Sequence, residues 1–264
     1  MVAGNERGLA DGRVVVLRSG GPGDVPAISG LYTGLSAESF YSRFYTVRPP
    51  PARVAQLAGF GSDAVCLVAA PPSDPGRLVA EARYIPTAPG TAELGLTVCD
   101  SYQGAGLGHL LLNALVERAH EEDGLDRLHA VVLLDNTPML RLLQRYGWVL
   151  ADPVEDFSVA HLEISTIGGM PGWPEGSAGR RVLVERRGWF DDRRVAALRS
   201  AGQDIRQCTG PLGRIGRTCA LVSSGRCRLA EEADMIVSLL PADEPDCAAV
   251  LAAHRRLWPH RLAE

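Results

Sequence analysis

The sequence predicts an α/β protein whose central sheet is mixed and largely antiparallel, with helices on both faces, followed by a small α/β domain with a parallel sheet. Three observations lead to this prediction. Three apolar runs separated by Pro- and Gly-rich turns indicate an antiparallel meander in the first half of the chain. A glycine-rich loop and an amphipathic, leucine-rich helix follow the meander. Beyond residue 180, strand-like and helix-like segments alternate, which is typical of parallel sheets.

The first half is expected to begin with a strand and two helices. Arg13–Leu17 is an apolar strand, and Asp24 is the expected N-cap of the first helix. Ser36 is the expected N-cap of the second helix, and Glu38 lies in its first turn, where the helix dipole favours a negative charge. The three strands of the meander are expected at Ala64–Ala70, Arg77–Ile85 and Ala92–Val98.

After the meander, a loop with three glycines leads into the amphipathic helix. The apolar stripe of this helix contains Leu110, Leu111, Leu115 and Val116. The remaining elements of the first half are a buried strand at Arg127–Asn136, a helix that Gly147 ends, and a last strand at Phe157–Ile164.

A segment rich in glycine and proline divides the chain. We predict a main domain at residues 1–165, a linker at residues 166–179 and a small accessory domain at residues 180–264. In the accessory domain, a helix that starts near Asp191 or Asp192 and is capped by Gly202 lies between two strands.

The composition is that of a soluble globular protein: 46% of the 264 residues are hydrophobic and 22% are charged. The net charge is −4, and all 27 basic residues are arginine, a balance that argues against a nucleic-acid partner. No apolar run approaches the roughly 20 residues of a membrane span, and the N-terminus lacks the layout of a signal peptide. We therefore expect a cytoplasmic protein without a membrane partner.

The glycine-rich loop predicts a phosphate site, because a strand–loop–helix arrangement points unpaired backbone N–H groups at the positive end of a helix dipole. The loop is not a Walker P-loop, since His109 and Leu110 stand where that motif has Lys-Ser/Thr. It is also a poor dinucleotide fingerprint, since Gly104, Gly106 and Gly108 alternate and a meander precedes them.

Two motifs resemble those of the GNAT family of N-acetyltransferases. The pyrophosphate loop of that family has the pattern Gln/Arg-x-x-Gly-x-Gly/Ala, which Gln103–Gly108 (QGAGLG) matches in full. The second motif of the family, an asparagine followed by a helix that ends in Gly-Phe, is similar to Asn136–Trp148 (NTPMLRLLQRYGW). The resemblance extends over most of residues 13–165. The alternative is a glycine-rich turn in an unrelated α/β domain.

The resemblance implies that acetyl-CoA is the co-substrate. Backbone amides of the loop would surround its pyrophosphate, Val98 would pair through its backbone with the pantetheine arm, and Asn136 would reach the same arm from the next strand. The loop residues are Gln103, Gly104, Ala105, Gly106, Leu107 and Gly108.

Glu93 is the candidate general base. An amine with a pKa of roughly 10.4 must lose a proton before it attacks at neutral pH, and a nearby carboxylate can take that proton. Glu93 matches the glutamate of bacterial protein-lysine acetyltransferases, and Leu35–Phe44 resembles their substrate-side helix. The resemblance implies direct attack by an amine, such as a protein lysine, in a ternary complex. The alternative for Glu93 is a solvated carboxylate at a strand edge.

One departure from the family pattern supports a second hypothesis. Many members carry a tyrosine four residues before the glycine of the second motif, proposed to protonate the leaving thiolate, and here that residue is Leu143. Tyr146 is not a direct substitute. The alternative function is a catalytically weak acyl-CoA-binding sensor, with the accessory domain as its output.

Three cysteines of the accessory domain, Cys208, Cys219 and Cys227, have spacings that match no CxxC pair. We expect them to be structural, with a metal or redox site as the alternative. The histidines show no metal-ligand spacing, and we predict no metal site.

Overall fold

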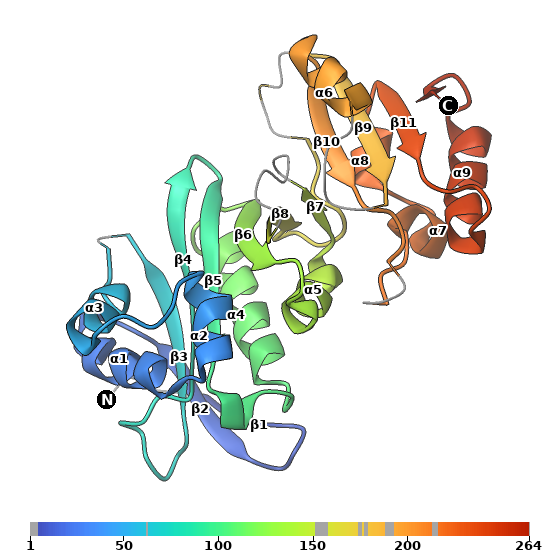
Figure 1. Cartoon of the computed structure of the whole chain (residues 1–264). Coiled ribbons are helices and arrows are strands. Elements are labelled where there is room, and N and C mark those ends of the chain that lie inside the picture. Colours follow the sequence, from blue (N-terminus) through green and yellow to red (C-terminus); the bar gives the residue numbers. More distant parts are fainter. Residues whose placement is uncertain are drawn as a thin grey trace. The chain divides into compact units, whose positions relative to one another are not determined.

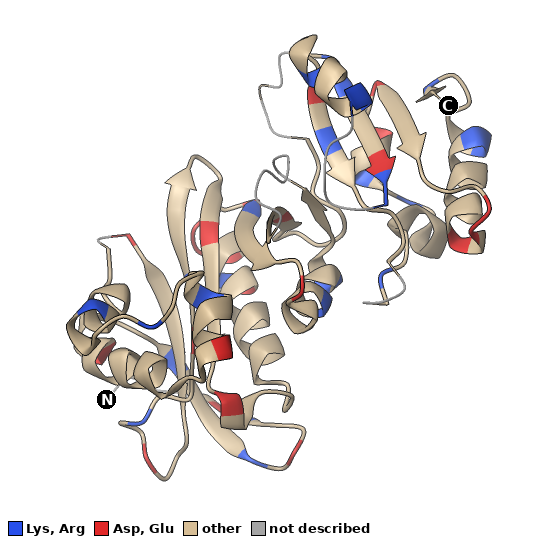
Figure 2. Cartoon of the chain, in the orientation of Figure 1, with Lys and Arg blue, Asp and Glu red and all other residues tan. Residues whose placement is uncertain are grey.

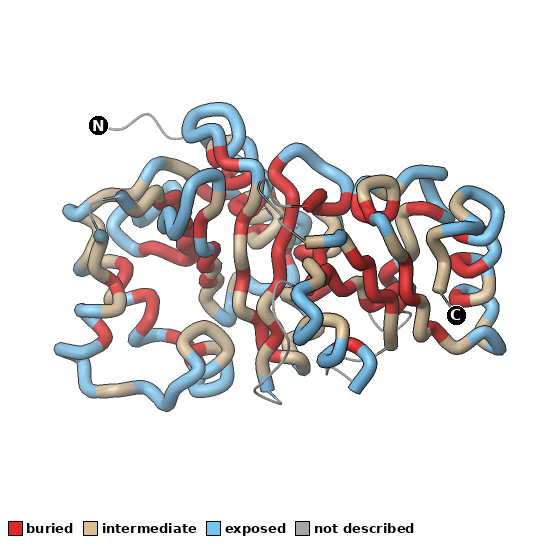
Figure 3. The backbone as a smooth tube through the Cα atoms, turned by 90° about the horizontal axis from the view of Figure 1, so that it is seen from above, coloured by how far each residue is buried: buried red, intermediate tan, exposed pale blue. Residues whose placement is uncertain are grey.

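The computed structural model describes residues 5–61, 63–150, 158–173, 176, 179–187, 193–212 and 216–263 (Figure 1). The chain divides into two compact units, residues 1–128 and 129–264. Basic and acidic residues are interspersed in both units (Figure 2). Buried stretches alternate with exposed turns along the backbone (Figure 3). The predicted mixed α/β class is confirmed.

The sheet of the first unit is an antiparallel meander in chain order, as the apolar runs predict. In β4 and β5, Glu81 pairs with Thr97, and Ile85 pairs with Glu93. A short N-terminal strand, which the sequence analysis does not predict, adds a hairpin at one edge. The strands are β1 (Asn5–Gly8), β2 (Val14–Ser19), β3 (Val65–Ala70), β4 (Ala80–Ala88) and β5 (Thr91–Val98).

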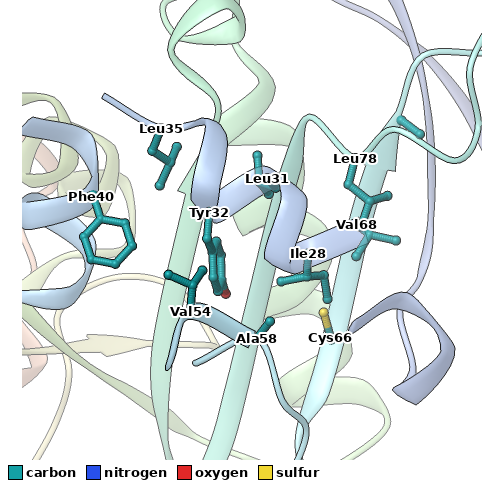
Figure 4. Packing of buried hydrophobic residues seen from close by; sticks show 11 residues of the cluster. Ile28, Leu31, Tyr32, Leu35, Phe40, Val54, Ala58, Cys66, Val68 and Leu78 are labelled. Atoms are coloured by element: carbon teal, nitrogen blue, oxygen red, sulfur yellow. The ribbon is translucent and has the colours of Figure 1, made fainter. Parts of the chain in front are cut away.

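Three helices pack on one face of this sheet: α1 (Val25–Gly34), α2 (Ala37–Phe44) and α3 (Pro51–Leu57). Ile28 and Tyr32 of α1 belong to one buried cluster with Cys66 and Val68 of β3 (Figure 4). Because side chains alternate along a strand, Cys66 and Val68 share this face while Leu67 points to the other.

The two predicted helix caps have different outcomes. Ser36 caps α2, where its Oγ accepts a hydrogen bond from the Ser39 N–H at 3.1 Å. Asp24 precedes α1 but its side chain does not cap it, because a 3₁₀ turn, η1 (Pro22–Asp24), comes directly before the helix. The Asp24 carboxylate instead pairs with Arg18 at 2.6 Å and accepts from the Gly21 N–H at 3.0 Å.

Helix α4 (Leu107–Glu121) packs against β3, β4 and β5 on the opposite face. Tyr84 of β4 points to this face and donates a hydrogen bond to Asp123, just beyond the helix. The stripe that α4 buries includes three of the four residues expected from the sequence; Leu110 is only half-buried. The buried residues are Leu107, Leu111, Leu112, Leu115, Val116 and Ala119.

The second unit contains a sheet in the order β6-β8-β7-β10-β9-β11-β12. The pairs among β9, β10, β11 and β12 are parallel, as predicted for the accessory domain, and β7 pairs antiparallel with β8 and with β10. The strands are β6 (Arg127–Leu133), β7 (Trp148–Leu150), β8 (Val159–Ser165), β9 (Arg181–Arg186), β10 (Asp204–Cys208), β11 (Met235–Leu239) and β12 (Leu262–Ala263).

The helices of this unit are α5 (Thr137–Leu143), α6 (Arg193–Ser200), α7 (Ala220–Ser224), α8 (Arg228–Glu231) and α9 (Pro245–Leu257). A 3₁₀ turn, η3 (Gln144–Tyr146), extends α5 to Gly147, which has a positive φ of 56°. Asp191 and Asp192, expected near the start of α6, lie outside the described residues.

Part of the segment expected as a linker, residues 170–173, is packed. Met170 and Trp173 are buried in one cluster with Val149 of β7 and Leu183 of β9. The Trp173 Nε1–H donates to the Leu229 carbonyl at 3.0 Å. At Met170 and Trp173 this glycine- and proline-rich segment is therefore held in place by its packing. The domain limits at 165 and 180 stay a prediction.

Candidate functional site

The glycine-rich loop has the backbone conformation that its glycines permit. After β5 ends, the 3₁₀ turn η2 (Asp100–Tyr102) leads to the loop, and α4 begins at Leu107. Gly104 and Gly106 have φ of 75° and 88°, in the left-handed region that other residues rarely adopt. A Cβ at either position would meet no atom within 4 Å, so both glycines border open space.

Five consecutive N–H groups of this loop are unpaired among the described residues: those of Gly104, Ala105, Gly106, Leu107 and Gly108. The first backbone bonds of the helix start further on, where His109 and Leu110 donate to the Gly106 carbonyl at 3.1 and 3.2 Å. The Ala105 carbonyl accepts from the Ala10 N–H at 3.0 Å, which ties the loop to the β1–β2 hairpin. Unpaired N–H groups at a helix N-terminus are suited to bind an anion.

Gln103 braces the start of the loop. Its Nε2 donates to the Val98 carbonyl and to the Ser39 Oγ, both at 3.1 Å. The Cys99 N–H donates to the Val79 carbonyl. Because the backbone groups of successive residues in a strand point to opposite sides, the N–H and C=O of Val98 point away from β4. Gln103 and Val98 therefore meet at the entrance of the loop, Gln103 through its side chain and Val98 through its carbonyl.

Asp100 joins the loop to α2, a contact that the sequence analysis missed. Its carboxylate accepts from the Ser36 N–H at 2.9 Å, the Ser36 Oγ at 2.7 Å and the Ser39 Oγ at 2.6 Å. Burial raises the pKa of Asp100, but the hydrogen bonds from Ser39 and Ser36 outweigh it and hold that pKa below its ordinary value. No local signal could reveal these bonds, because the partners are 61 and 64 residues apart in the chain.

A groove of about 490 Å³ borders the same turn. Its walls come from α1, the β3–β4 connection and the residues directly before the loop, including Gly30, Arg77 and Cys99. Residues 103–108 themselves do not line this groove.

Glu93 lies on β5, exposed, on the face of the sheet that α1, α2 and α3 cover. Gly95 and Thr97 follow it on the same face. The Arg43 Nε donates to the Thr97 Oγ1 at 3.2 Å, and a Cβ at Gly95 would lie 2.7 Å from the Arg43 Cζ. The absent side chain at Gly95 therefore leaves room for a guanidinium group beside Glu93.

Tyr45 is the one non-glycine residue with a positive φ, 57°, among those described. It ends α2 in the left-handed conformation. Burial raises the pKa of Tyr45, Arg43 lowers it and Glu93 raises it, so all three side chains lie within electrostatic range. The end of α2 thus brings a cation and a phenol to the surroundings of Glu93.

The remaining predicted residue, Asn136, belongs to the second unit, where it caps α5. Its Oδ1 accepts from the Met139 N–H at 3.1 Å, which leaves the side-chain NH₂ as the group for another contact. Leu143 is fully buried in α5 and carries no ionisable group, and Tyr146 is half-buried in η3. The pantetheine contact of Asn136 stays a prediction.

Residues 36–148 match the model of the acetyltransferase (GNAT) family. This part of the chain is similar to the GNAT family. The matched segment begins at the cap of α2, contains Glu93 and the glycine-rich loop, and ends at the first residue of β7.

Two relatives extend this result. The chain is 32% identical over 138 residues to Acetyltransferase Pat of Mycolicibacterium smegmatis, which covers 50% of this chain and 40% of Pat. The structure of this chain is similar to the crystal structure of the GNAT domain of S. lividans PAT, with a TM-score of 0.52 and 25% identity. The match covers 61% of this chain and 96% of that domain. The chain thus spans less than half the length of the M. smegmatis protein.

Among the described residues, no group of three or more His, Cys, Asp or Glu side chains is arranged to hold a metal ion. No helix in the same part of the chain is both long and apolar enough to cross a membrane.

Proposed function

We propose that the protein is an acetyl-CoA-dependent N-acetyltransferase that acetylates an amine. The observation that carries this proposal is the row of five unpaired N–H groups at residues 104–108, which ends in the first turn of a 15-residue helix. Acetyl-CoA fits this loop, because a pyrophosphate needs several convergent donors and a backbone without bulky side chains. Positive φ and open space at Gly104 and Gly106 meet both needs.

Acetyl-CoA would supply the acetyl group as an activated thioester, and the chain would supply binding, orientation and a base. The loop amides hold the diphosphate, while Gln103 keeps the end of β5 and the start of α2 together. Val98 and Asn136 offer backbone and amide groups to the pantetheine arm.

Glu93 takes the proton of the acceptor amine. Its carboxylate is exposed, so an incoming ammonium group can reach it. The acceptor amine then attacks directly in a ternary complex, and no covalent acyl-enzyme on a side chain is needed.

The first acceptor to test is a protein lysine, since the α2 and β5 segments resemble those of bacterial protein-lysine acetyltransferases. The chain has no lysine of its own. Any acetyl-lysine detected in an assay therefore comes from the acceptor, which removes self-acetylation of lysine as a source of signal.

A second candidate function, an acyl-CoA-binding sensor with little turnover, is favoured by Leu143. A fully buried leucine cannot protonate a leaving thiolate. Both functions require acetyl-CoA to bind at the glycine-rich loop, and only the enzyme transfers the acetyl group to an acceptor.

The test is CoA release from acetyl-CoA, measured with lysine peptides, whole acceptor proteins and small amines. The enzyme predicts CoA release that depends on the acceptor, with an equal amount of acetylated product. Tight acetyl-CoA binding without acceptor-dependent release across that panel would support the sensor. Absence of acetyl-CoA binding would contradict both.

A further inference from the structure

The three cysteines of the second unit lie around one small cavity. Cys208 ends β10, Cys219 directly precedes α7, and Cys227 directly precedes α8. All three line a cavity of about 10 Å³, which admits roughly one water-sized molecule. The other polar residues of its wall are Glu185 of β9, Arg217, Thr218 and His254 of α9.

Two donors face the Cys208 sulfur. The Arg217 Nη2 lies 3.5 Å from the Cys208 Sγ, and the Gly210 N–H donates to it at 3.4 Å. The Arg217 guanidinium and the Gly210 N–H therefore both direct a positively polarised hydrogen at this sulfur. Cys208 is also half-buried rather than sealed in the core. Of the three, it has the environment of a nucleophilic sulfur.

Cys219 and Cys227 have the opposite character. Burial raises the pKa of Cys219 to about 11, and the nearby Cys208 adds to this effect. Burial likewise raises the pKa of Cys227 to about 12, again with a contribution from Cys208. Both therefore stay protonated near neutral pH, within electrostatic range of Cys208. A protonated thiol next to a reactive sulfur can complete a disulfide.

The arrangement favours sulfur chemistry over metal binding. Within the described residues, no three of these ligand types converge as a metal site would require. His254 is instead held by Glu185, with 2.8 Å between Nε2 and Oε1, and both are almost fully buried. The His254 Nδ1 and the Glu185 Oε2 have no hydrogen-bond partner, which suits a cavity that receives a small polar molecule.

We propose that Cys208 is a thiol modification site, oxidised by a small peroxide such as hydrogen peroxide and then joined in a disulfide to Cys219 or Cys227. Cys208 gives up its thiol proton and its sulfur attacks one peroxide oxygen; the O–O bond breaks, a sulfenic acid forms, and the departing hydroxide takes up that proton to give water. The second thiol attacks the sulfenic sulfur, the S–S bond forms, and its proton leaves with the hydroxyl group as water. In total, two thiols lose two electrons and hydrogen peroxide becomes two waters.

Arg217 connects this site to the GNAT segment. The same Nη2 donates to the Trp148 carbonyl at 2.8 Å, and the guanidinium lies 3.9 Å above the Trp148 ring. Trp148 is the first residue of β7 and the last residue of the family match. The Cys208 sulfur is a hydrogen-bond acceptor of Arg217, and oxidation changes this sulfur. The oxidation therefore affects β7 through the Arg217 side chain.

The test is disulfide mapping in the full-length protein. Protein treated with hydrogen peroxide, and an untreated sample, are denatured with an alkylating agent, digested with trypsin and analysed by mass spectrometry. Arg214, Arg217 and Arg226 separate the three cysteines into different peptides. We expect a Cys208–Cys219 or Cys208–Cys227 disulfide in the treated sample, and its loss after dithiothreitol.

Cys208→Ser should abolish this disulfide, whereas Cys99→Ser, a half-buried cysteine outside the cavity, should leave it unchanged. Four results would overturn the proposal: no loss of free thiols, a Cys219–Cys227 disulfide that omits Cys208, a sulfonic acid at Cys208 without a disulfide, or one metal ion per chain in the isolated protein. If Cys208→Ser does not fold, the mapping of the wild-type protein decides alone.

Discussion

At the scale of single residues, the site depends on what surrounds Glu93. The guanidinium of Arg43 lies over Gly95, two residues along the same face of β5, and is held by Thr97. Glu93 is predicted from its match to the glutamate of bacterial protein-lysine acetyltransferases, whereas Arg43 could not be predicted, because its contact needs α2 to pack on β5. The guanidinium of Arg43 fits there only because Gly95 has no side chain. A glycine in a strand has several possible explanations, so Gly95 alone does not predict this contact.

Replacing the carboxylate tests the base. Glu93→Gln should lower the rate of acetyl transfer about 10²–10⁴-fold, since a general base contributes that much, and leave acetyl-CoA affinity nearly unchanged. The deficit should shrink at high pH, where the free amine needs no base. The measurement is the pH profile of kcat and KM, with the exposed Glu38→Gln in α2 as the matched control. A Glu93→Gln enzyme as fast as wild type at pH 7 would remove Glu93 from the mechanism.

At the scale of elements, α2 is tied to the loop through Asp100. Because the pKa of Asp100 is lowered in the folded state, its hydrogen bonds stabilise the protein at neutral pH. This contribution is lost as the pH falls below the ordinary aspartate value, about 3.9, and through the lower value of the folded state.

Asp100→Asn should therefore lower the Tm at pH 7 and show a smaller further loss on acidification than wild type. The measurement is Tm against pH from 7 to 3, with the exposed Asp126→Asn as control. Parallel curves for wild type and Asp100→Asn would contradict a depressed pKa at this residue.

The loop itself can be tested with a pair of matched glycines. Gly106 and Gly124 flank α4, both have a positive φ, 88° and 62°, and a Cβ at either would meet no atom within 4 Å. Gly106→Val and Gly124→Val should therefore strain the backbone alike. Only Gly106→Val should abolish the rise in Tm that acetyl-CoA causes. An equal shift in both variants would place acetyl-CoA elsewhere.

These elements also separate what could be predicted from what could not. The meander, the loop and the Ser36 cap follow from local pattern, because strand alternation, glycine and capping act over a few residues. The packed segment around Trp173 could not be predicted, because its composition matches a linker and its partner, the Leu229 carbonyl, is 56 residues away. The cavity that Cys208, Cys219 and Cys227 share could likewise not be predicted from their spacing in the sequence.

At the scale of the whole molecule, the end of the GNAT segment is part of the core of the second unit. Val149 packs with Met170, Trp173 and Leu183, and Arg206 of β10 pairs with the buried Glu163 of β8. We infer that a chain cut at residue 165 would expose this surface of β7. Residues after 165 would then pack directly on β7 rather than follow it on a flexible tether.

Arg217 gives the sharpest stability test of this connection. Arg217→Ala removes the hydrogen bond to Trp148 and the stacking on its ring, and should cost about 1.5–3 kcal/mol for the charged hydrogen bond alone. Arg226→Ala removes an exposed ion pair of 3.3 Å to Glu231 and should change stability by less than about 1 kcal/mol. Chemical denaturation measures both. Equal losses would show that Arg217 does not hold β7.

The central claim, that the loop at residues 103–108 holds the pyrophosphate of acetyl-CoA, is tested most directly by calorimetry with two ligands. S-acetylpantetheine carries the same thioester and arm as acetyl-CoA but lacks the pyrophosphate and nucleotide. We expect wild type to bind acetyl-CoA at least about 100-fold more tightly, about 2.8 kcal/mol, and Gly106→Val to lose most of that difference. Equal affinity of wild type for the two ligands, or an unchanged preference in Gly106→Val, would contradict the account.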